Sequence, residues 1–424
     1  MFEVVEINMM KLNRDKDKII NICNSNWFKY GLVFLTMLLS SSIELVTDIE
    51  IINMGKNAFF IIVPLILIVL MIKNKQINKD INITFLLLCV FSFISVIWSI
   101  SPKDTIKGSI LLVGTTILAM YISKNYEKEE IMKSLLIWFF ALVVINVVLV
   151  VFKFDIIYQI EETRYNNAIK GIFKHRNTLG LYMSMAIGVG LWFILQNKEK
   201  VNKYIPIATV ICGGILLYLS KSMTSLLLGI LIIFLIYFTR YKKFNTILCY
   251  SIIPLMIIGV LVLVFTPNWF KEILESLGRN STLTGRSVIW AGVIAAIVYK
   301  PLLGYGFGAF WTVNPHSVLF VLSEYKYELP VNSHNGYLDL LIEFGVVGVI
   351  AIIIWIAYMV KKLKETTKVN LNKNNKYIGY IMSYFIFILV FNLVESSLMK
   401  PCNSSYILLV VFTNMLSRIS KESI

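Results

Sequence analysis

The sequence predicts an all-α polytopic membrane protein with about twelve transmembrane helices. Hydrophobic residues occupy 57% of the 424 positions, charged residues occupy only 15%, and the mean hydropathy is +0.75. A soluble domain of this length needs a smaller apolar fraction to build its core. The apolar residues also come in runs close to the length of a membrane-spanning helix. The 40 basic residues lie in short clusters between these runs, which is typical of the loops of a membrane protein.

The apolar runs place the spans in order along the chain. A spanning helix needs about 20 predominantly apolar residues. On that measure the predicted spans are residues 29–47, 57–73, 81–99, 106–123, 132–152, 178–196, 203–220, 223–239, 245–266, 343–360, 377–394 and 404–417. The first run follows a polar, basic stretch and has no small-residue cleavage site behind it, so we expect a signal anchor that stays in the protein.

The basic clusters orient the spans. If the N-terminal segment 1–26 is cytoplasmic, 24 of the 40 basic residues fall on the cytoplasmic side, six of them in the loop 361–376. The bias of basic residues toward the cytoplasm therefore predicts that both termini are cytoplasmic. The net charge of +15 then belongs to these loops, and no nucleic-acid partner is expected.

Two long loops, 153–177 and 267–334, are predicted on the extracytoplasmic side of a single integral membrane domain that covers residues 1–424. Their aromatic and apolar content argues for an ordered cap rather than disorder. Within the second loop, residues 287–300 form an apolar run that is too short to span and ends at Pro301. We predict a short helix there that lies on, or dips into, the outer interface.

The five cysteines do not indicate a disulfide framework or a metal site. They stand singly, without a CxxC pair or a ligand-like spacing to histidine, at positions Cys23, Cys89, Cys212, Cys249 and Cys402. We interpret them as lipid-facing or core-facing thiols and expect neither a metal nor a cofactor.

Basic and hydroxyl side chains from separate segments are predicted to meet on the outer face. The topology places all three histidines there. The stretch FKHRNTLG (173–180) leads into a span, STLTGRSVIW (281–290) precedes the short helix, and LSKSMTSLL (219–227) forms a tight turn. The candidate residues are His175, His316, His334, Lys174, Arg176, Asn177, Arg286, Lys221, Ser222 and Thr224.

This composition favours a phosphate-bearing ligand, and a diphosphate in particular. A planar guanidinium binds two phosphate oxygens at once, an ammonium adds a point charge, and helix N-termini favour anions. The alternative is that these side chains only anchor helices at the membrane interface. Anchoring suits Lys170, Lys174 and Lys300 better than Arg176 and Arg286, because each arginine directly precedes an apolar helix.

The stretch NSHNGYLDLLIEFGVVGVI (332–350) puts polar residues at the start of an apolar segment. A helix that starts at Asn335 would hold His334 beside the positive end of the helix dipole as a neutral general base, or as a partner for a sugar hydroxyl. The alternative is a histidine that only caps the helix. Asp339 and Glu343 share a face, and we expect them to pair with a basic residue inside the bundle. Gly345 and Gly348 are expected to loosen the helix before the main span.

The stretch GYGFGAFW (304–311) has no strand before it, which argues against a dinucleotide-binding loop. An aromatic turn is expected instead. Tyr305 in this turn is a candidate for stacking on a sugar ring, and a place in the aromatic belt at the membrane surface is the alternative.

Three stretches taken together resemble the superfamily of O-antigen ligases and O-antigen polymerases, which are bacterial membrane glycosyltransferases. They are FKHRNTLG, LTGRSVIWAGVIAAIVYKPLLGYGFGAF and NSHNGYLDLLIEFGVVGVI, and they cover residues 171–350. The resemblance implies a GT-C-like fold and metal-independent transfer of a glycan from an undecaprenyl-diphosphate donor to a glycan acceptor. It further implies that Arg176 and Arg286 bind the diphosphate and that His334 contacts the acceptor hydroxyl.

One departure from the family pattern concerns the turn after the seventh span. Members often carry an arginine there, whereas this chain has Lys221 and Met223. The residues therefore predict catalysis by His334, Arg286 and Arg176, and substrate contacts from His175, Asn177, Lys174, Lys221, Ser222, Asn335 and Tyr305.

The function expected on this basis is that of a polysaccharide polymerase in the bacterial cytoplasmic membrane, with a flippase and a chain-length regulator as candidate partners. The alternative within the family is a ligase that transfers finished polymer to a lipid A core or another acceptor. A transporter or lipid flippase is the alternative of a different class, but it would place polar residues near the middle of the membrane. Here the candidates lie at the outer ends of the spans.

Overall fold

The described part of the chain is mainly helical. The computed structural model describes residues 25–73, 83–158, 168–196, 201–241, 244, 247–248, 286–312, 331–368 and 375–422, and contains no strand among them. The α-helices are α2 (Asn26–Ser40), α3 (Glu44–Asp48), α4 (Glu50–Lys73), α5 (Ile83–Ile94), α6 (Pro102–Asn125), α7 (Lys128–Val151), α8 (Arg176–Gln196), α9 (Tyr204–Leu219), α10 (Met223–Phe238), α13 (Arg286–Tyr299), α15 (Gly336–Lys368), α16 (Asn375–Phe391) and α17 (Ser404–Lys421). The predicted all-α class is confirmed.

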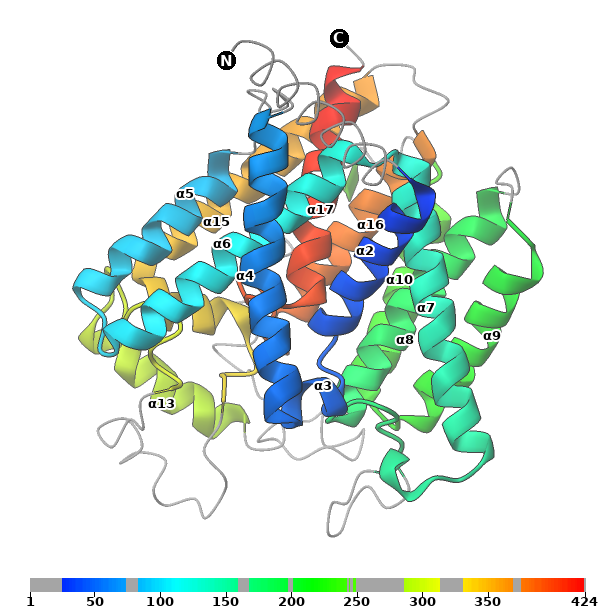
Figure 1. The fold of residues 1–424 in the computed structure, drawn as a ribbon, viewed down its shortest axis with the longest axis horizontal. Helices are drawn as coiled ribbons and strands as arrows, with labels where there is room; N and C mark the ends of the chain where they lie inside the picture. Colours follow the sequence, from blue (N-terminus) through cyan, green and yellow to red (C-terminus); the bar gives the residue numbers. More distant parts are fainter. Residues whose placement is uncertain are drawn as a thin grey trace, which may run out of the picture.

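Five of these helices are long and apolar enough to cross a membrane: α4, α6, α7, α8 and α15. Shorter apolar helices accompany them, among them α5, α9, α10 and α16. The protein is therefore a multi-pass membrane protein. Figure 1 shows that α2 begins and α17 ends at the same end of the bundle, while α8 and α13 begin at the opposite end. We call this opposite end the site end.

Eleven of the twelve predicted spans overlap a described helix, and the ninth, 245–266, lies almost wholly outside the described residues. The prediction of one helix over 29–47 is wrong. The hydroxyl groups of Ser40 and Ser41 donate to the carbonyl of Met37, and Ser42 has a φ of 54°. Serine hydroxyls at a helix end compete with the backbone for these carbonyls. The helix α2 therefore stops at Ser40, and the chain resumes as α3.

The basic segment 361–376 was also expected to be a loop, but α15 continues as a helix to Lys368. The helix predicted over 287–300 is confirmed as α13, which packs against α15. Val293 and Ala296 of α13 share a small buried cluster with Ile342 of α15 and with Phe310. This cluster is separate from the main core.

The helix α8 lies at the centre of one half of the bundle, between α7, α9 and α10 (Figure 1). Its small residues allow this close packing. A Cβ added at Gly180 would lie 2.4 Å from the Cβ of Ser225 on α10, so only glycine permits this approach. The start of α8, which carries Arg176, is thereby held against the start of α10.

The helix α15 is broken at Gly345, as the sequence predicted. Gly345 has φ 63° and ψ −161°, which leaves backbone groups on both sides of the break without partners in the helix. The segment 301–306, which we call the clasp, supplies those partners. Val346 and Val347 donate to the carbonyls of Pro301 and Leu302 at 2.8 and 3.4 Å, and Tyr305 and Gly306 donate to the carbonyls of Ile342 and Glu343 at 2.9 and 3.1 Å. The clasp thus ties the C-terminal end of α13 to the N-terminal part of α15.

Candidate functional site

A buried carboxylate that the sequence analysis did not single out lies at the centre of the candidate site. Glu395 follows α16, and its side chain is 19% exposed. The Oε1 atom accepts from Arg286 Nη2 at 2.8 Å, and the Oε2 atom lies 3.0 Å from His334 Nδ1. One carboxylate therefore holds the two residues that the sequence predicted to act on opposite sides of a transfer reaction.

The connection between α16 and α17 is shaped by Asn392, which is fully buried. Its Oδ1 atom accepts from the backbone N–H groups of Ser397 and Leu398 at 2.8 and 3.0 Å. The carbonyl groups of Asn392 and Glu395 both accept from Gly336 N, at 2.9 and 3.2 Å. These contacts fix Glu395 against the start of α15.

The start of α15 presents His334. The Oδ1 atom of Asn335 accepts from the backbone of Tyr337 and Leu338 at 3.0 and 3.2 Å, so Asn335 caps the helix. His334 precedes this cap with a φ of 52°, a left-handed backbone conformation that is uncommon for residues other than glycine. Trp290 of α13 donates from Nε1 to the carbonyl of Ser333 at 2.8 Å. The helix that carries Arg286 is thereby bonded to the segment that carries His334.

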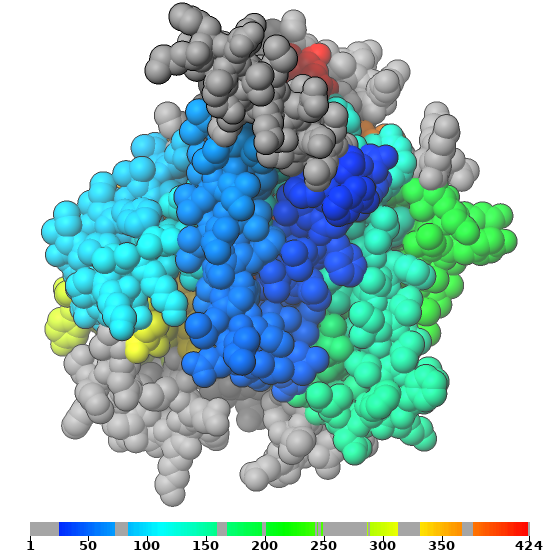
Figure 2. Space-filling model, in the orientation of Figure 1, coloured from blue at the N-terminus to red at the C-terminus, as the bar shows by residue number. Residues whose placement is uncertain are grey.

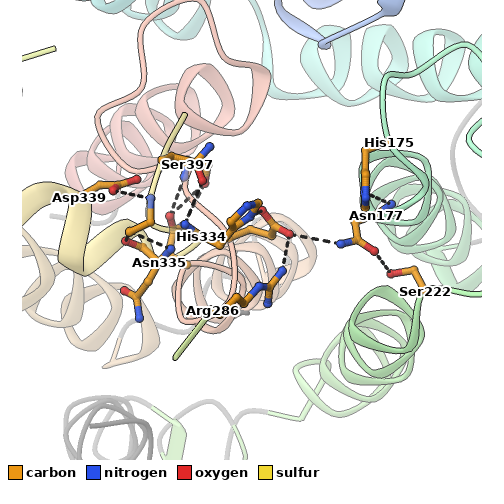
Figure 3. Close-up of polar contacts among 12 residues, drawn as sticks. His175, Asn177, Ser222, Arg286, His334, Asn335, Asp339 and Ser397 are labelled. Atoms are coloured by element: carbon orange, nitrogen blue, oxygen red, sulfur yellow. Dashed lines mark hydrogen bonds and ion pairs between the residues drawn. The ribbon is translucent and has the colours of Figure 1, made fainter. Parts of the chain in front are cut away.

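The starts of α8 and α10 form the other side of the site. Asn177 Nδ2 donates to Glu395 Oε1 at 3.4 Å, and Asn177 Oδ1 accepts from Ser222 Oγ at 2.8 Å. Arg176 is 5% exposed and donates from Nη1 to the carbonyl of Lys221 at 2.7 Å. Figure 3 shows Asn177 and Ser222 on one side and Arg286 and His334 on the other, joined by hydrogen bonds and ion pairs. A polar chain therefore crosses the site from α10 to α15.

The segment before α8 is held by its neighbours. His175 Nδ1 accepts from the backbone N–H of Asn177 at 3.1 Å, so this histidine caps α8. Lys170 pairs with Glu44 at 2.7 Å, and Lys174 pairs with Asp48, both on the short helix α3. The Oδ1 atom of the buried Asn146 accepts from Ile172 N at 3.1 Å. These contacts set the direction in which Arg176 enters the site.

The electrostatics keep Glu395 ionised. Burial raises the pKa of this carboxyl group, but the hydrogen bond to His334 and the charge of Arg286 outweigh burial and hold the pKa below its ordinary value. An ionised carboxylate only accepts hydrogen bonds. The Nδ1 atom of His334 must therefore carry the hydrogen toward Glu395, and in the neutral ring the lone pair lies on Nε2. That lone pair can accept a proton from a hydroxyl group.

The site also has an excess of positive potential. Arg286 pairs with Glu395, Arg176 donates to the carbonyl of Lys221, and the starts of α8, α10 and α15 add the positive ends of three helix dipoles. A polyanionic group such as a diphosphate would be attracted to this environment.

The structure brings most of the predicted site residues together. Arg286, His334, Asn177 and Ser222 belong to one polar chain, and Arg176 is bonded to the neighbouring turn. Asn335 lies beside His334 as the cap of α15. Lys221 contributes its carbonyl group, while its side chain is exposed.

Other predicted residues make contacts outside this polar chain, and their substrate roles stay predictions. Lys174 is paired with Asp48, and Tyr305 donates from its hydroxyl to the carbonyl of Ala296 at 2.9 Å within the clasp. Within the described residues, Asp339 accepts from the backbone N–H of Ser333 at 2.9 Å, and the expected ion pair with a basic side chain is not found. His316 lies outside the described residues.

Glu395 was missed, although the sequence held a signal. A lone carboxylate stands directly behind the predicted span 377–394, on the side where the orientation places the histidines and arginines. Carboxylates at such positions are costly and are usually paired or functional. Attention to charge complementarity between the outer ends of the spans would have found it.

Part of the candidate site lies in a region that is similar to a known protein family. Residues 207–353 match the model of the O-antigen ligase family. The resemblance to an O-antigen ligase-like superfamily is confirmed. The matched region includes Ser222, Arg286 and His334, whereas Arg176 and Glu395 lie outside it.

Curated relatives support the same superfamily. A Rickettsia prowazekii protein with a provisional polysaccharide ligase name is 24% identical over 230 residues, which is 51% of this chain and 55% of that protein. A similarly named protein of Rickettsia conorii is 26% identical over 236 residues, or 52% and 55%. The exopolysaccharide production protein ExoQ of Rhizobium meliloti is 22% identical over 269 residues, or 62% and 60%. The chain thus spans little more than half the length of the curated relatives it matches.

Proposed function

We propose that this protein is a polysaccharide polymerase that joins undecaprenyl-diphosphate-linked repeat units at the outer face of the cytoplasmic membrane, with both termini in the cytoplasm. The match to the O-antigen ligase family supports the broader class, which is an enzyme of surface-glycan assembly. The observation that carries the proposal is the shared carboxylate Glu395, which holds Arg286 and His334 side by side. A group that can bind a leaving diphosphate and a group that can activate a hydroxyl then face the same space.

The proposed reaction is the attack of an acceptor sugar hydroxyl on the anomeric carbon of the lipid-linked glycan. The new bond joins the acceptor oxygen to that carbon. The bond between the carbon and the diphosphate oxygen breaks, and undecaprenyl diphosphate leaves with the electron pair. His334 accepts the hydroxyl proton on Nε2, because its Nδ1–H is committed to Glu395. Arg286 and Arg176 stabilise the negative charge that develops on the leaving diphosphate.

The proposed transfer needs no metal ion or cofactor, because the two guanidinium groups take the place of a cation at the diphosphate. Both arginines are well placed for that role. The Arg286 side chain is 13% exposed and Arg176 is 5% exposed, so each would meet the ligand in a partly dehydrated setting. Electrostatic attraction to a phosphate is stronger there than in bulk water.

A second candidate function is a ligase that moves finished polymer to a lipid A core or another acceptor. Two observations favour it: the family that matches residues 207–353 is described as O-antigen ligase, and the Rickettsia relatives carry polysaccharide ligase names. The two functions share the donor and the chemistry, and they differ in the acceptor. A product analysis therefore separates them.

The test is an assay of the purified protein with undecaprenyl-diphosphate-linked oligosaccharide in the presence of EDTA. We expect the wild type to form a ladder of longer lipid-linked glycans. Removal of a group that stabilises the transition state costs roughly a hundredfold or more in rate, so Arg286→Ala and His334→Ala should abolish the visible ladder. Lys153→Ala, a change of an exposed lysine at the end of α7, serves as the control and should behave as wild type.

Other outcomes would count against the proposal. Transfer of a single finished polymer to an added lipid A core, without a ladder, would favour the ligase. A ladder that vanishes with EDTA would contradict metal independence. If no glycan is transferred, but labelled donor lipid crosses a liposome bilayer equally well with all of these proteins, the transport alternative replaces the enzyme.

A further inference from the structure

Three lysines from separate elements gather at the site end of the bundle, outside the polar chain of Glu395. Lys56 lies near the start of α4, Lys107 lies in the second turn of α6, and Lys400 lies in the connection before α17. Lys56 is within electrostatic range of both of the others. Lys56 is half-buried, while Lys107 and Lys400 are exposed. We call these residues the lysine cluster.

Close packing of the backbones fixes the lysine cluster. The helices α4 and α6 lie side by side, as Figure 2 shows. They approach so closely that a Cβ added at Gly114 of α6 would lie 1.8 Å from the carbonyl oxygen of Phe60. The connection that carries Lys400 is fastened to α6, because Cys402 N donates to Thr115 Oγ1 at 3.0 Å. The three charges therefore cannot separate by a simple movement of the helices.

In the part of the chain that the structure describes, the lysine cluster lacks the ion pairs that neutralise neighbouring lysines. Lys170 and Lys174, at the same end of the bundle, are paired with Glu44 and Asp48. Among the described residues, no carboxylate lies within ion-pair distance of any lysine in the cluster. Like charges that are held together and partly buried raise the free energy of the folded protein unless an anion joins them.

Lys400 lies within electrostatic range of Asp339 and Glu343 of α15, but neither of them forms an ion pair with it. Another carboxylate near the cluster, that of Asp104, is engaged with hydroxyl groups. Asp104, at the start of α6, lies within electrostatic range of Lys107 and Lys103. Its Oδ2 atom accepts from the hydroxyl groups of Ser101 and Thr312 at 2.6 and 3.0 Å. Asp104 therefore fastens Thr312 to α6, and the lysine cluster keeps an excess of positive charge.

The proposed reaction involves a second diphosphate, which a cluster of lysines can bind. When one lipid-linked glycan is transferred to another, two diphosphates are present, one on the donor and one on the acceptor. Arg176 and Arg286 would hold the donor diphosphate. Lys400 belongs to the same connection as Glu395, five residues further along the chain, so the cluster adjoins the candidate site.

We propose that Lys56, Lys107 and Lys400 form a second anion site, which binds the diphosphate of the acceptor lipid. This inference rests on the proposed function and adds to it how the acceptor is held. Lysine ammonium groups act as point charges and do not impose the planar fork of arginine. That chemistry suits a group that must be retained but does not become more negative during the reaction.

The test compares two acceptors for one donor. The donor is a lipid-diphosphate-linked glycan whose terminal acceptor hydroxyl is replaced by hydrogen, so that it can only donate. One acceptor is the repeat unit on undecaprenyl diphosphate, and the other is the same repeat unit as a methyl glycoside without phosphate. The variant is Lys56→Gln, Lys107→Gln and Lys400→Gln combined. We expect its KM for the diphosphate acceptor to rise about tenfold or more, the change expected from the loss of charge-assisted contacts.

The comparison also predicts what should not change. The triple variant should keep the wild-type KM and kcat for the methyl glycoside. Replacing the same three lysines by arginine should restore the KM for the diphosphate acceptor. If the triple variant does not fold, the single variant Lys400→Gln replaces it, because Lys400 is exposed and Lys56 is half-buried. Its matched control is Lys153→Gln, which changes another exposed lysine. An equal KM of wild type and Lys400→Gln for the diphosphate acceptor would overturn the proposal.

Three further outcomes separate this proposal from the alternatives. A KM change that appears in nanodiscs of phosphatidylglycerol but not of phosphatidylcholine would mean that the cluster binds membrane phospholipid, and it would overturn the assignment to the acceptor. Wild-type protein that transfers to neither acceptor would instead contradict the proposed function itself. Normal transfer to both acceptors by the triple variant would leave the function standing and remove only the second anion site.

Discussion

Replacement of Glu395 by glutamine is expected to remove most of the transferase activity while leaving the protein folded. The Oε1 atom of glutamine can still accept from Arg286 and Asn177, so the amide nitrogen would face Nδ1 of His334. That nitrogen donates, and Nδ1 would then have to accept. The ring hydrogen would move to Nε2, where it blocks the lone pair that takes the acceptor proton in the proposed reaction. A comparable loss of the correct tautomer costs on the order of 10³ to 10⁴ in kcat in hydrolases.

The measurement is kcat of the purified Glu395→Gln variant in the polymerisation assay, with thermal unfolding as a check on folding. Glu365→Gln is the control, because Glu365 also belongs to an ion pair, with Lys362 at 2.8 Å, but lies near the far end of α15. The control should keep wild-type activity. A Glu395→Gln variant with near-normal kcat would show that the carboxylate does not set the tautomer of His334.

The dependence on pH follows from the same contact. The pKa of Glu395 lies below its ordinary value, so its contribution to stability is fully present above about 4.3, the ordinary glutamic acid pKa. That contribution is lost only as the pH falls through the lowered pKa of the folded protein. We therefore expect the difference in unfolding temperature between wild type and Glu395→Gln to stay constant between pH 5 and about 8, and parallel unfolding measurements of the two proteins over that range would check it.

The second large effect is expected from Gly345→Ala, which should destabilise the protein and disrupt the site together. Gly345 has a φ of 63°, and an added Cβ would lie 2.3 Å from the carbonyl carbon and oxygen of Leu302. Both atoms belong to the backbone of the clasp, so they cannot move aside as a flexible side chain could. Positive φ and this overlap together should cost about 3 kcal/mol or more of the free energy of unfolding.

Thermal unfolding in detergent or nanodiscs measures this effect, and the matched control is Gly214→Ala. Gly214 lies inside α9, and a Cβ added there would meet no atom within 4 Å. Because alanine favours a helix over glycine, the control should be neutral or slightly stabilising. We further expect the transferase activity of Gly345→Ala to fall more than its unfolding temperature alone would explain, because the clasp links Arg286 and His334 through α13 and α15. Wild-type unfolding and activity in Gly345→Ala would show that the break in α15 tolerates a side chain.

The sequence was sufficient to determine the helices and their order. Apolar runs separated by basic clusters located eleven segments that overlap described helices, since burial in lipid acts on each segment almost independently of the others. Local chemistry also located the break at Gly345 and the helix start after Asn335, because both depend on a glycine or a capping side chain that is visible in the sequence. It failed at Ser40, where three consecutive serines end α2 inside an otherwise apolar run.

The contacts between helices were decided only by the tertiary structure. The sequence predicted Arg286, His334 and Asn177 as site residues, but nothing local to them indicates that one carboxylate, 61 positions after His334, joins all three. The same reasoning assigned Lys174 to a substrate, whereas folding places it against Asp48 on α3. Charge and hydropathy fix which end of a helix a residue occupies, because each segment has its own requirement for lipid or water. Which side chains contact one another depends on the packing of helices such as α8 and α10, whose close approach involves residues that are distant in the sequence.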